Sequence, residues 1–361
     1  PSPAKAGEGN LPTSWGGTLA REASQRGGDA HTRTQRRNNV LSSGAPMAIS
    51  IDRIREAATV IDPAFKDTPQ FVAESLSQRL GVTVVLKVEC VNPIRSFKGR
   101  GTDYLMNRIG NQPQGFVCAS AGNFGQGMAY AARKRGQRLT VFAAVTANPL
   151  KVSRMRSLGA QVMLAGADFD AAKAAAKQHA RENGALYVED GLLPEIAEGA
   201  GTIARELGGM DEMLDAIFVP LGNGSLINGI GTWFKQLSPA TRVIGVCAEE
   251  APSMALSWRA GKPVSTESAT TVADGIAVRV PIPEALVAMR ATTDEVMLVA
   301  EEEILDAMRM LFHETGLVVE PAGAAGLAAI ASRRKELEGQ RVATPLCGGN
   351  LTEDQVRRWL L

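Results

Sequence analysis

The sequence predicts an α/β protein built on mostly parallel sheets, and two features of its pattern support this fold class. Short apolar runs rich in β-branched residues lack the alternation of polar and apolar positions typical of half-exposed strands. Amphipathic helical stretches separate these runs, as expected where helices cover both faces of a parallel sheet. The expected strands are 82–88, 115–119, 139–145, 161–164, 216–220, 243–248, 296–299 and 341–346.

Two expected helices have clear start and stop signals. Asp168 precedes the helix 169–183, which Gly184 would end, and Gly316 would end the helix 301–315. A third helix is expected over 128–135, after a glycine-rich turn.

Composition limits the classes of partner. The 361 residues are enough for about two domains with a sizeable core. A formal net charge of +1 gives no electrostatic basis for nucleic acid or an acidic membrane as the partner. No stretch approaches the roughly 20 apolar residues needed to span a bilayer. The pattern favours a protein whose main partner is a small molecule.

The four cysteines, Cys90, Cys118, Cys247 and Cys347, are scattered without a CxxC pair. This spacing argues against a zinc cluster or a disulfide framework, and it indicates a reducing compartment, so we expect a cytoplasmic protein.

Residues 1–46 are rich in Gly, Ser, Arg and Asn and lack hydrophobic periodicity, which predicts a disordered extension ahead of a natural start at Met47. Its five arginines also raise the alternative of a transit peptide, against which Glu8, Glu22 and Asp29 argue.

Lys98 lies in the segment Asn92-Pro-Ile-Arg-Ser-Phe-Lys-Gly-Arg-Gly101, between an expected strand and an expected helix. A lysine condenses with an aldehyde only as the neutral amine, so it needs partial desolvation or cationic neighbours. Arg95, Phe97 and Arg100 are near in sequence and meet this need. An ordinary surface lysine at a helix start is the alternative that this segment alone leaves open.

Two glycine-rich turns follow expected strands. At 119–127, backbone N–H groups and the Asn123 amide favour an anion such as a substrate carboxylate, although glycines that merely permit positive φ explain such a turn equally well. At 220–231, glycines and Ser225 before a helix can hold a phosphate. Ile227 stands where a dinucleotide fingerprint needs its third glycine, and the lysine of a P-loop is missing, so a single phosphate fits better.

Two further segments complete the pattern: Glu320-Pro-Ala-Gly-Ala324, before an alanine-rich stretch, and Pro345-Leu-Cys-Gly-Gly-Asn350. Together, in this order, the five motifs resemble the fold-type II pyridoxal-phosphate enzymes of the threonine and serine dehydratase family. Segments 199–203 and 271–277 look like further signatures of that family. The resemblance covers about residues 49–361.

The resemblance implies a fold like that of the tryptophan synthase β chain, with two open, twisted, mostly parallel sheets and a cleft between two lobes. A small lobe of residues 112–188 would be inserted into a large pyridoxal-phosphate-binding lobe of residues 47–111 and 189–361. It also implies a homodimer.

The resemblance further implies roles for matching residues. Lys98 would carry pyridoxal phosphate as a Schiff base and then move the Cα proton, with Phe97 packed near the ring. Asn123 would bind the phenolic oxygen, Cys347 would face the pyridine nitrogen, and Glu320 would belong to the same cofactor site. The cofactor phosphate would be held by Gly222, Asn223, Gly224, Ser225 and Leu226, and the substrate by Ser96, Ser120, Ala121, Gly122 and Asn123, with Ser96 also catalytic.

The implied activity is loss of water and ammonia from a β-hydroxy L-amino acid such as threonine or serine, which yields a 2-oxo acid. A neutral thiol at Cys347 makes the ring a weaker electron sink than a carboxylate would, and this favours β-elimination. The cofactor phosphate is expected to act as the acid for the leaving hydroxyl. Ala121 stands where related serine racemases carry a second base, which disfavours racemisation. No metal is expected, because Ala255 occupies the position of an acidic ligand.

Departures from the family pattern keep other chemistry open. Phe124 replaces a histidine common in the dehydratase turn, and Arg95 replaces a glycine. Phe124 and Asn92-Pro93 favour the alternative of β- or γ-replacement, as in threonine synthase or a cysteine synthase. A non-catalytic homologue that only binds the cofactor is the third possibility, against which Lys98 and Asn123 argue.

Overall fold

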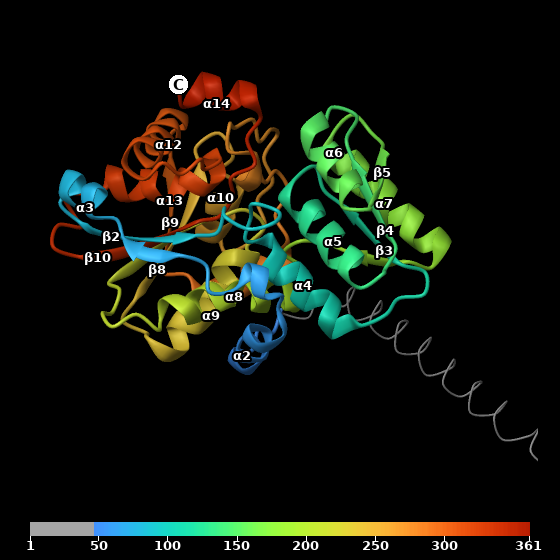
Figure 1. The fold of residues 1–361 in the computed structure, drawn as a ribbon, viewed down its shortest axis with the longest axis horizontal. Helices are drawn as coiled ribbons and strands as arrows, with labels where there is room; N and C mark the ends of the chain where they lie inside the picture. Colours follow the sequence, from blue (N-terminus) through green and yellow to red (C-terminus); the bar gives the residue numbers. More distant parts are fainter. Residues whose placement is uncertain (1–46) are drawn as a thin grey trace, which may run out of the picture. The chain divides into compact units, whose positions relative to one another are not determined.

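The computed structural model describes residues 47–361, so the predicted disordered extension 1–46 lies outside the described residues. Two sheets organise this part of the chain (Figure 1). The six-stranded sheet has the order β1 (Gln70–Val72), β2 (Thr83–Val88), β10 (Arg341–Leu346), β7 (Ala216–Pro220), β8 (Arg242–Ala248) and β9 (Glu295–Val299). The four-stranded sheet has the order β5 (Gln161–Leu164), β4 (Leu139–Ala143), β3 (Phe116–Ala119) and β6 (Leu186–Val188).

Strand direction agrees with the predicted fold class. The pairing of β1 with β2 is antiparallel, and every other pairing in the two sheets is parallel. The predicted α/β fold with two mostly parallel sheets is therefore confirmed. Strands β1 and β6 were not predicted, because runs of three residues are too short to show a periodicity.

The helices follow the strands along the chain. Their bounds are α2 (Ile51–Val60), α3 (Glu74–Leu80), α4 (Lys98–Ile109), α5 (Asn123–Lys134), α6 (Pro149–Ser157), α7 (Phe169–Asn183), α8 (Pro194–Leu207), α9 (Ser225–Leu237), α10 (Ser253–Ala260), α11 (Pro283–Thr292), α12 (Glu301–Thr315), α13 (Pro321–Ser332) and α14 (Glu353–Trp359), with short 3₁₀ turns η1 (Pro63–Phe65) and η2 (Asp274–Ile276). None of the described helices is long and apolar enough to cross a membrane.

Local hydrogen bonds stabilise the first turns of α7 and α5. The Asp168 carboxylate accepts a hydrogen bond from Ala171 N (2.8 Å), and Gly184 ends α7 at φ 64°, as predicted. The prediction of a helix start at residue 128 was wrong, because α5 begins at Asn123. Ser120 Oγ accepts a hydrogen bond from Gly125 N (2.9 Å) within the first turn of the helix. The amide of Asn123 is therefore at the helix start, at the end of β3.

Helices cover both faces of the six-stranded sheet. Val84 and Phe218 pack in an apolar core with α12 and α13, whereas their chain neighbours Val85 and Val219 pack in a second core with α8 and α9. Successive strand residues point to opposite faces, so these two cores lie on opposite sides of the sheet (Figure 1). Burial on both faces explains why the strands lack polar alternation.

Close helix packing fixes the position of α4. A Cβ atom on Gly199 of α8 would lie 2.6 Å from Arg100 O of α4, so only glycine allows this approach. A Cβ atom on Gly229 of α9 would similarly lie 2.0 Å from Ala197 O of α8. The three helices α4, α8 and α9 therefore pack backbone against backbone. This contact holds the start of α4, where Lys98 lies, next to the start of α9.

Candidate active site

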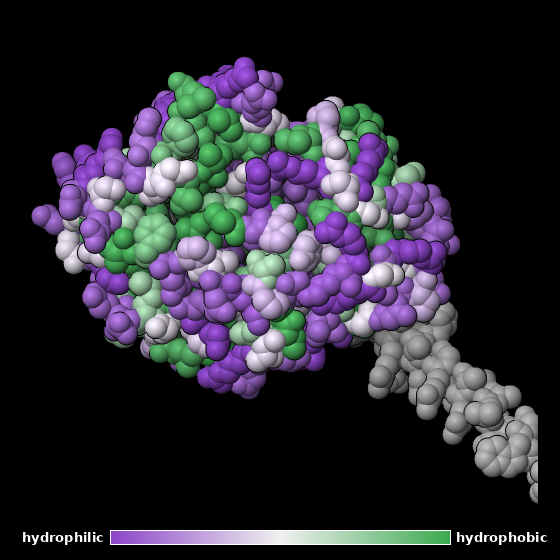
Figure 2. Space-filling model, in the orientation of Figure 1, coloured by the Kyte–Doolittle hydropathy of each residue, from purple (hydrophilic) through white to green (hydrophobic). Residues whose placement is uncertain are grey.

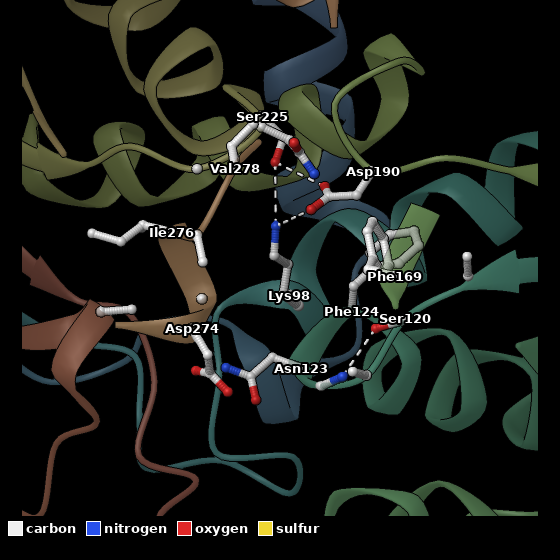
Figure 3. Close-up of a pocket in the computed structure, with 18 of the residues that line it drawn as sticks. Lys98, Ser120, Asn123, Phe124, Phe169, Asp190, Ser225, Asp274, Ile276 and Val278 are labelled. Atoms are coloured by element: carbon white, nitrogen blue, oxygen red, sulfur yellow. Dashed lines mark hydrogen bonds and ion pairs between the residues drawn. The ribbon is translucent and has the colours of Figure 1, made fainter. Parts of the chain in front are cut away.

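One cavity of about 460 Å³ collects residues from both sheets. Ser120 follows β3, Asp190 follows β6, Gly222 follows β7 and Cys347 follows β10, and all four line it. Ligands of open α/β sheets bind at the carboxyl ends of parallel strands, and this cavity has that position. Figure 3 shows that its labelled side chains surround the amine of Lys98.

Lys98 is the first residue of α4, and its side chain is 13% exposed. Its Nζ atom lies 2.6 Å from Asp190 Oδ2 and 3.4 Å from Ser225 Oγ. The ring of Phe97 lies beneath this amine, with its centroid 4.6 Å from Nζ. The amine is therefore in the cavity, partly desolvated, and ready to react with a carbonyl carbon once its proton is removed.

The arginines expected to influence Lys98 lie outside the cavity lining. Arg100 is fully buried and forms ion pairs with Glu89 (2.8 Å) and Glu206 (2.6 Å), and neither Arg95 nor Arg100 lines the cavity. Arg100 thus ties the first turn of α4 to the residue after β2 and to α8. Partial burial, rather than these cationic neighbours, distinguishes Lys98 from a surface lysine.

The start of α9 offers free backbone donors to the cavity. Gly224 precedes the helix at φ 89°, no described side chain caps it, and its first turn carries no acidic residue. Residues 222–226 all line the cavity. The first N–H groups of a helix have no partner within the helix, and they favour an anion. This arrangement fits a phosphate group.

The turn after β3 provides a second polar wall. Ser120 Oγ accepts hydrogen bonds from Gly122 N (3.2 Å) and Gly125 N (2.9 Å), so the hydroxyl oxygen shapes the turn. Asn123 Nδ2 donates to Glu320 Oε1 (2.6 Å), and Asn123 Oδ1 accepts from Asn350 Nδ2 (2.8 Å). Ala121 and Gly122 also line the cavity. The Asn123 amide is therefore held in one orientation.

Glu320 and Cys347 are buried at the cavity wall. Burial raises the pKa of the Glu320 carboxyl, and the charge of Lys151 opposes this shift. Burial also raises the pKa of the Cys347 thiol, and the charge of Glu320 adds to the effect. Cys347 Sγ donates weakly to Ala322 O (3.7 Å). The thiol is thus a neutral group, as the sequence analysis assumed.

Among the predicted site residues, Ser96 alone is not part of the cavity lining. It is fully buried, its Oγ donates to Cys347 O (3.1 Å), and the same oxygen accepts from Lys98 N (3.4 Å). The structure therefore places Ser96 behind the site, where it joins the start of α4 to the end of β10. The other predicted residues all line the cavity: Phe97, Lys98, Ser120, Ala121, Gly122, Asn123, Gly222, Asn223, Gly224, Ser225, Leu226, Glu320 and Cys347.

The charged residues that pair within the cavity lining were not predicted from the sequence. Asp190 is the most important, because its carboxylate contacts both Lys98 and Ser225. Three further ion pairs have both partners in the lining: Lys151–Asp274, Lys173–Glu189 and Arg279–Asp170. Asp190 comes two residues after β6, so the rule on strand ends would have identified it if that short strand had been recognised.

Comparisons with known proteins agree with this geometry. The sequence model of the family described as pyridoxal-phosphate dependent enzyme matches residues 61–348. The L-threonine ammonia-lyase of Geobacter sulfurreducens is 39% identical over 306 residues, which cover 82% of this chain and 75% of the relative. That of Thermotoga maritima is 35% identical over 314 residues, covering 86% and 78%. The solved structure of processed threonine deaminase isoform 2 from Solanum lycopersicum superposes with a TM-score of 0.80 at 29% identity, covering 87% of this chain and 94% of that chain.

Proposed function

Because the chain belongs to the family of pyridoxal-phosphate-dependent enzymes, we propose that it removes water from a β-hydroxy L-amino acid and releases a 2-oxo acid and ammonia. The relatives described above are named threonine ammonia-lyases, which supports elimination as the reaction. The observation that carries the proposal is the position of Lys98. Its amine lies between the uncapped start of α9 and the turn at 120–123.

The residues present fit the cofactor. The uncapped N–H groups of α9 would hold its phosphate, Lys98 would bind its aldehyde carbon, and Asn123 would reach its phenolic oxygen. The neutral thiol of Cys347 would face the pyridine nitrogen, with Glu320 holding Asn123 from behind. When bound, pyridoxal phosphate supplies an electron-withdrawing ring that stabilises negative charge at the Cα atom of the amino acid.

The remaining steps belong to side chains and backbone groups of this chain. The turn at 120–123 presents backbone donors to the substrate carboxylate, which orients the Cα–H bond. The neutral amine of Lys98 removes the Cα proton. Ala121 has no hydroxyl or other titratable group, so it cannot protonate Cα from a second side. This favours elimination over racemisation.

The proposal is tested by assaying 2-oxo acid and ammonia release from purified protein with added pyridoxal phosphate. The panel is L-threonine, L-serine, threo-3-hydroxyaspartate and phenylserine. We expect both products from at least one substrate, and loss of both in Lys98→Ala. The matched control is Lys177→Ala, which removes another lysine near the cavity, outside its lining. No product from the panel, with cofactor bound, would contradict the proposal and favour β- or γ-replacement.

We further propose that the small lobe comprises residues 112–188, inserted between segments 47–111 and 189–361, and that the protein works as a cytoplasmic homodimer. The four-stranded sheet, with strands from Phe116 to Val188, supports the lobe bounds. The four free, buried cysteines suit a reducing compartment. Sedimentation velocity at micromolar concentration tests the dimer, and a single monomeric species would contradict it.

A further inference from the structure

Asp190 differs from the other paired acidic residues of the cavity in its cationic partner, which is the amine of Lys98. Its side chain is only 14% exposed, and its Oδ2 atom lies 2.6 Å from Lys98 Nζ. The other ion pairs within the lining, Lys151–Asp274, Lys173–Glu189 and Arg279–Asp170, use cations that take no part in the proposed reaction. Among the described residues, Asp190 is thus the carboxylate that forms an ion pair with the reactive amine.

The contacts around Asp190 form a closed ring. Ser225 Oγ donates to Asp190 Oδ1 (3.0 Å), and Lys98 Nζ donates both to Asp190 Oδ2 (2.6 Å) and to Ser225 Oγ (3.4 Å). Figure 3 shows the three side chains converging, with Asp190 coming from the side of the four-stranded sheet and Ser225 from the start of α9. The carboxylate therefore lies between the amine that removes the Cα proton and the donors expected to hold the cofactor phosphate.

We propose that Asp190 is the acid that protonates the leaving β-hydroxyl of the substrate. This inference rests on the proposed elimination, and it replaces the cofactor phosphate, the sequence-based expectation, with a carboxyl group of this chain. Hydroxide is a poor leaving group, because the pKa of water is about 15.7, so the departing oxygen needs a proton. A general acid supplies this proton if it comes within hydrogen-bond distance of the departing oxygen.

The proton transfers balance over one turnover. Lys98 Nζ takes the Cα proton, and the electron pair of the Cα–H bond forms the Cα=Cβ double bond. The Cβ–O bond breaks with its electron pair going to oxygen. The Lys98 ammonium passes a proton to Asp190 across the 2.6 Å contact, and Asp190 gives it to the departing oxygen, so water leaves and both groups return to their starting forms. The proton taken from Cα thus leaves as part of the water.

A pair of substrates isolates this step. β-Chloro-L-alanine loses chloride, which needs no proton, whereas L-serine loses hydroxide, and both reactions require the same removal of the Cα proton. In Asp190→Asn we expect kcat with L-serine to fall by about 10²- to 10⁴-fold, as for loss of a general acid. With β-chloro-L-alanine we expect kcat to stay within about tenfold of wild type. The asparagine keeps the shape of the side chain; its one amide oxygen can still accept a hydrogen bond from Lys98, while its NH2 group can donate to the hydroxyl oxygen of Ser225.

Two controls separate this role from a structural one. Glu182→Gln alters an exposed carboxylate of α7 that is outside the cavity lining, and it should leave both reactions unchanged. Binding of pyridoxal phosphate to the apoprotein, measured by equilibrium dialysis, should change by less than about threefold in Asp190→Asn. This readout does not depend on turnover.

The outcomes are distinguishable. A selective loss with L-serine, with cofactor binding retained, supports Asp190 as the acid. Equal losses with both substrates, or weakened cofactor binding, would overturn it and assign Asp190 to holding Lys98 or the cofactor. An undiminished rate with L-serine would also overturn it. If wild-type protein acts on β-chloro-L-alanine but on no β-hydroxy amino acid, the proposed function itself fails, and this inference fails with it.

Discussion

Burial decides the chemistry of the four cysteines, all of which are buried and free. It raises the pKa of Cys90 from 9.0 to about 11 and the pKa values of Cys118 and Cys247 to about 12. The thiolate is the reactive form, and a shift of two units means about 100-fold less of it at a given pH. We therefore expect little alkylation of the native protein by iodoacetamide at pH 8.

Mass spectrometry of alkylated peptides checks this prediction, with urea-denatured protein as the control in which all four cysteines should react. Rapid labelling of a cysteine in the native protein would contradict it and would point to a thiolate. Because Cys347 lines the cavity, its labelling would also remove the argument that a neutral thiol faces the cofactor.

The single residues of the site that could be predicted are those that belong to sequence motifs. Lys98, Asn123 and the loop 222–226 lie in turns directly after strands, so their convergence follows from parallel topology. The burial of Ser96 could not be predicted, because it depends on contact with Cys347 O, 251 residues away in the chain. Asp190 was missed for a local reason: the strand before it, β6, has only three residues and shows no periodicity.

At the scale of elements, the contact between α8 and α9 depends on Gly229. Alanine is favoured over glycine in a helix interior by about 1 kcal/mol. Here, however, the added Cβ atom would lie 2.0 Å from Ala197 O, and a backbone oxygen cannot move aside cheaply. Overpacking of this kind costs about 1–3 kcal/mol, so the clash outweighs the gain in helix propensity.

We therefore expect Gly229→Ala to lower the free energy of unfolding and to weaken cofactor binding, because α9 carries the loop expected to hold the phosphate. Urea denaturation and equilibrium dialysis measure the two effects. Gly209→Ala is the control, since its Cβ atom would meet only an ordinary contact at 3.4 Å. Equal stability of the two variants would contradict the close packing of the helices.

The contact of α2 with α8 contains a buried carboxyl group that titrates near neutral pH. Glu198 Oε1 accepts hydrogen bonds from Ser50 N (3.1 Å) and Arg53 Nη1 (3.5 Å), while Oε2 has no hydrogen-bond partner among the described residues. Burial raises the pKa of Glu198 from 4.5 to about 7. The folded protein therefore holds this proton more tightly than the unfolded chain does.

It follows that the stabilising contribution of Glu198 to the free energy of unfolding is fully present below about pH 4.5. This contribution is lost as the pH rises through about 7. Glu198→Gln removes the titration, so it should be more stable than wild type at pH 8, by up to about 3 kcal/mol, with little difference near pH 4.5. Urea denaturation at both pH values measures this, with the exposed Glu353→Gln as control. The same stability change at both pH values would refute it.

The fold as a whole was more predictable from the sequence than the bounds of its elements. Apolar runs and caps located β7, β10, α7 and α12 correctly, because these signals are local. The start of α5 was misplaced, because glycines at 125 and 127, poor helix formers, sit inside it. A Cβ atom on Gly127 would lie 2.8 Å from Thr102 Oγ1 of α4, so tertiary packing explains a residue that local propensity disfavours.

At the scale of the whole described molecule, ion pairs across the cavity connect α6 and α7 with the segment 274–279. Lys151 of α6 pairs with Asp274 of η2, and Arg279 donates through Nε to Asp170 Oδ2 of α7 (2.8 Å). The side chains of Arg279 and Asp170 are 42% and 36% exposed. Exposed pairs of this kind contribute about 0–1 kcal/mol each and are screened by salt. Their expected effect is therefore on closure around the substrate rather than on stability.

We expect Asp170→Asn to raise KM for the amino acid by up to about fivefold, the factor that corresponds to about 1 kcal/mol, with kcat nearly unchanged. The KM of the wild type should rise with added NaCl, and this dependence should be weaker in the variant. Asp306→Asn is the control, because its pair with Arg309 is also exposed but lies outside the cavity lining. A KM that does not depend on salt would contradict a role of this pair in substrate binding. An unfolding free energy lowered by more than about 2 kcal/mol in Asp170→Asn would show that the pair acts on folding instead.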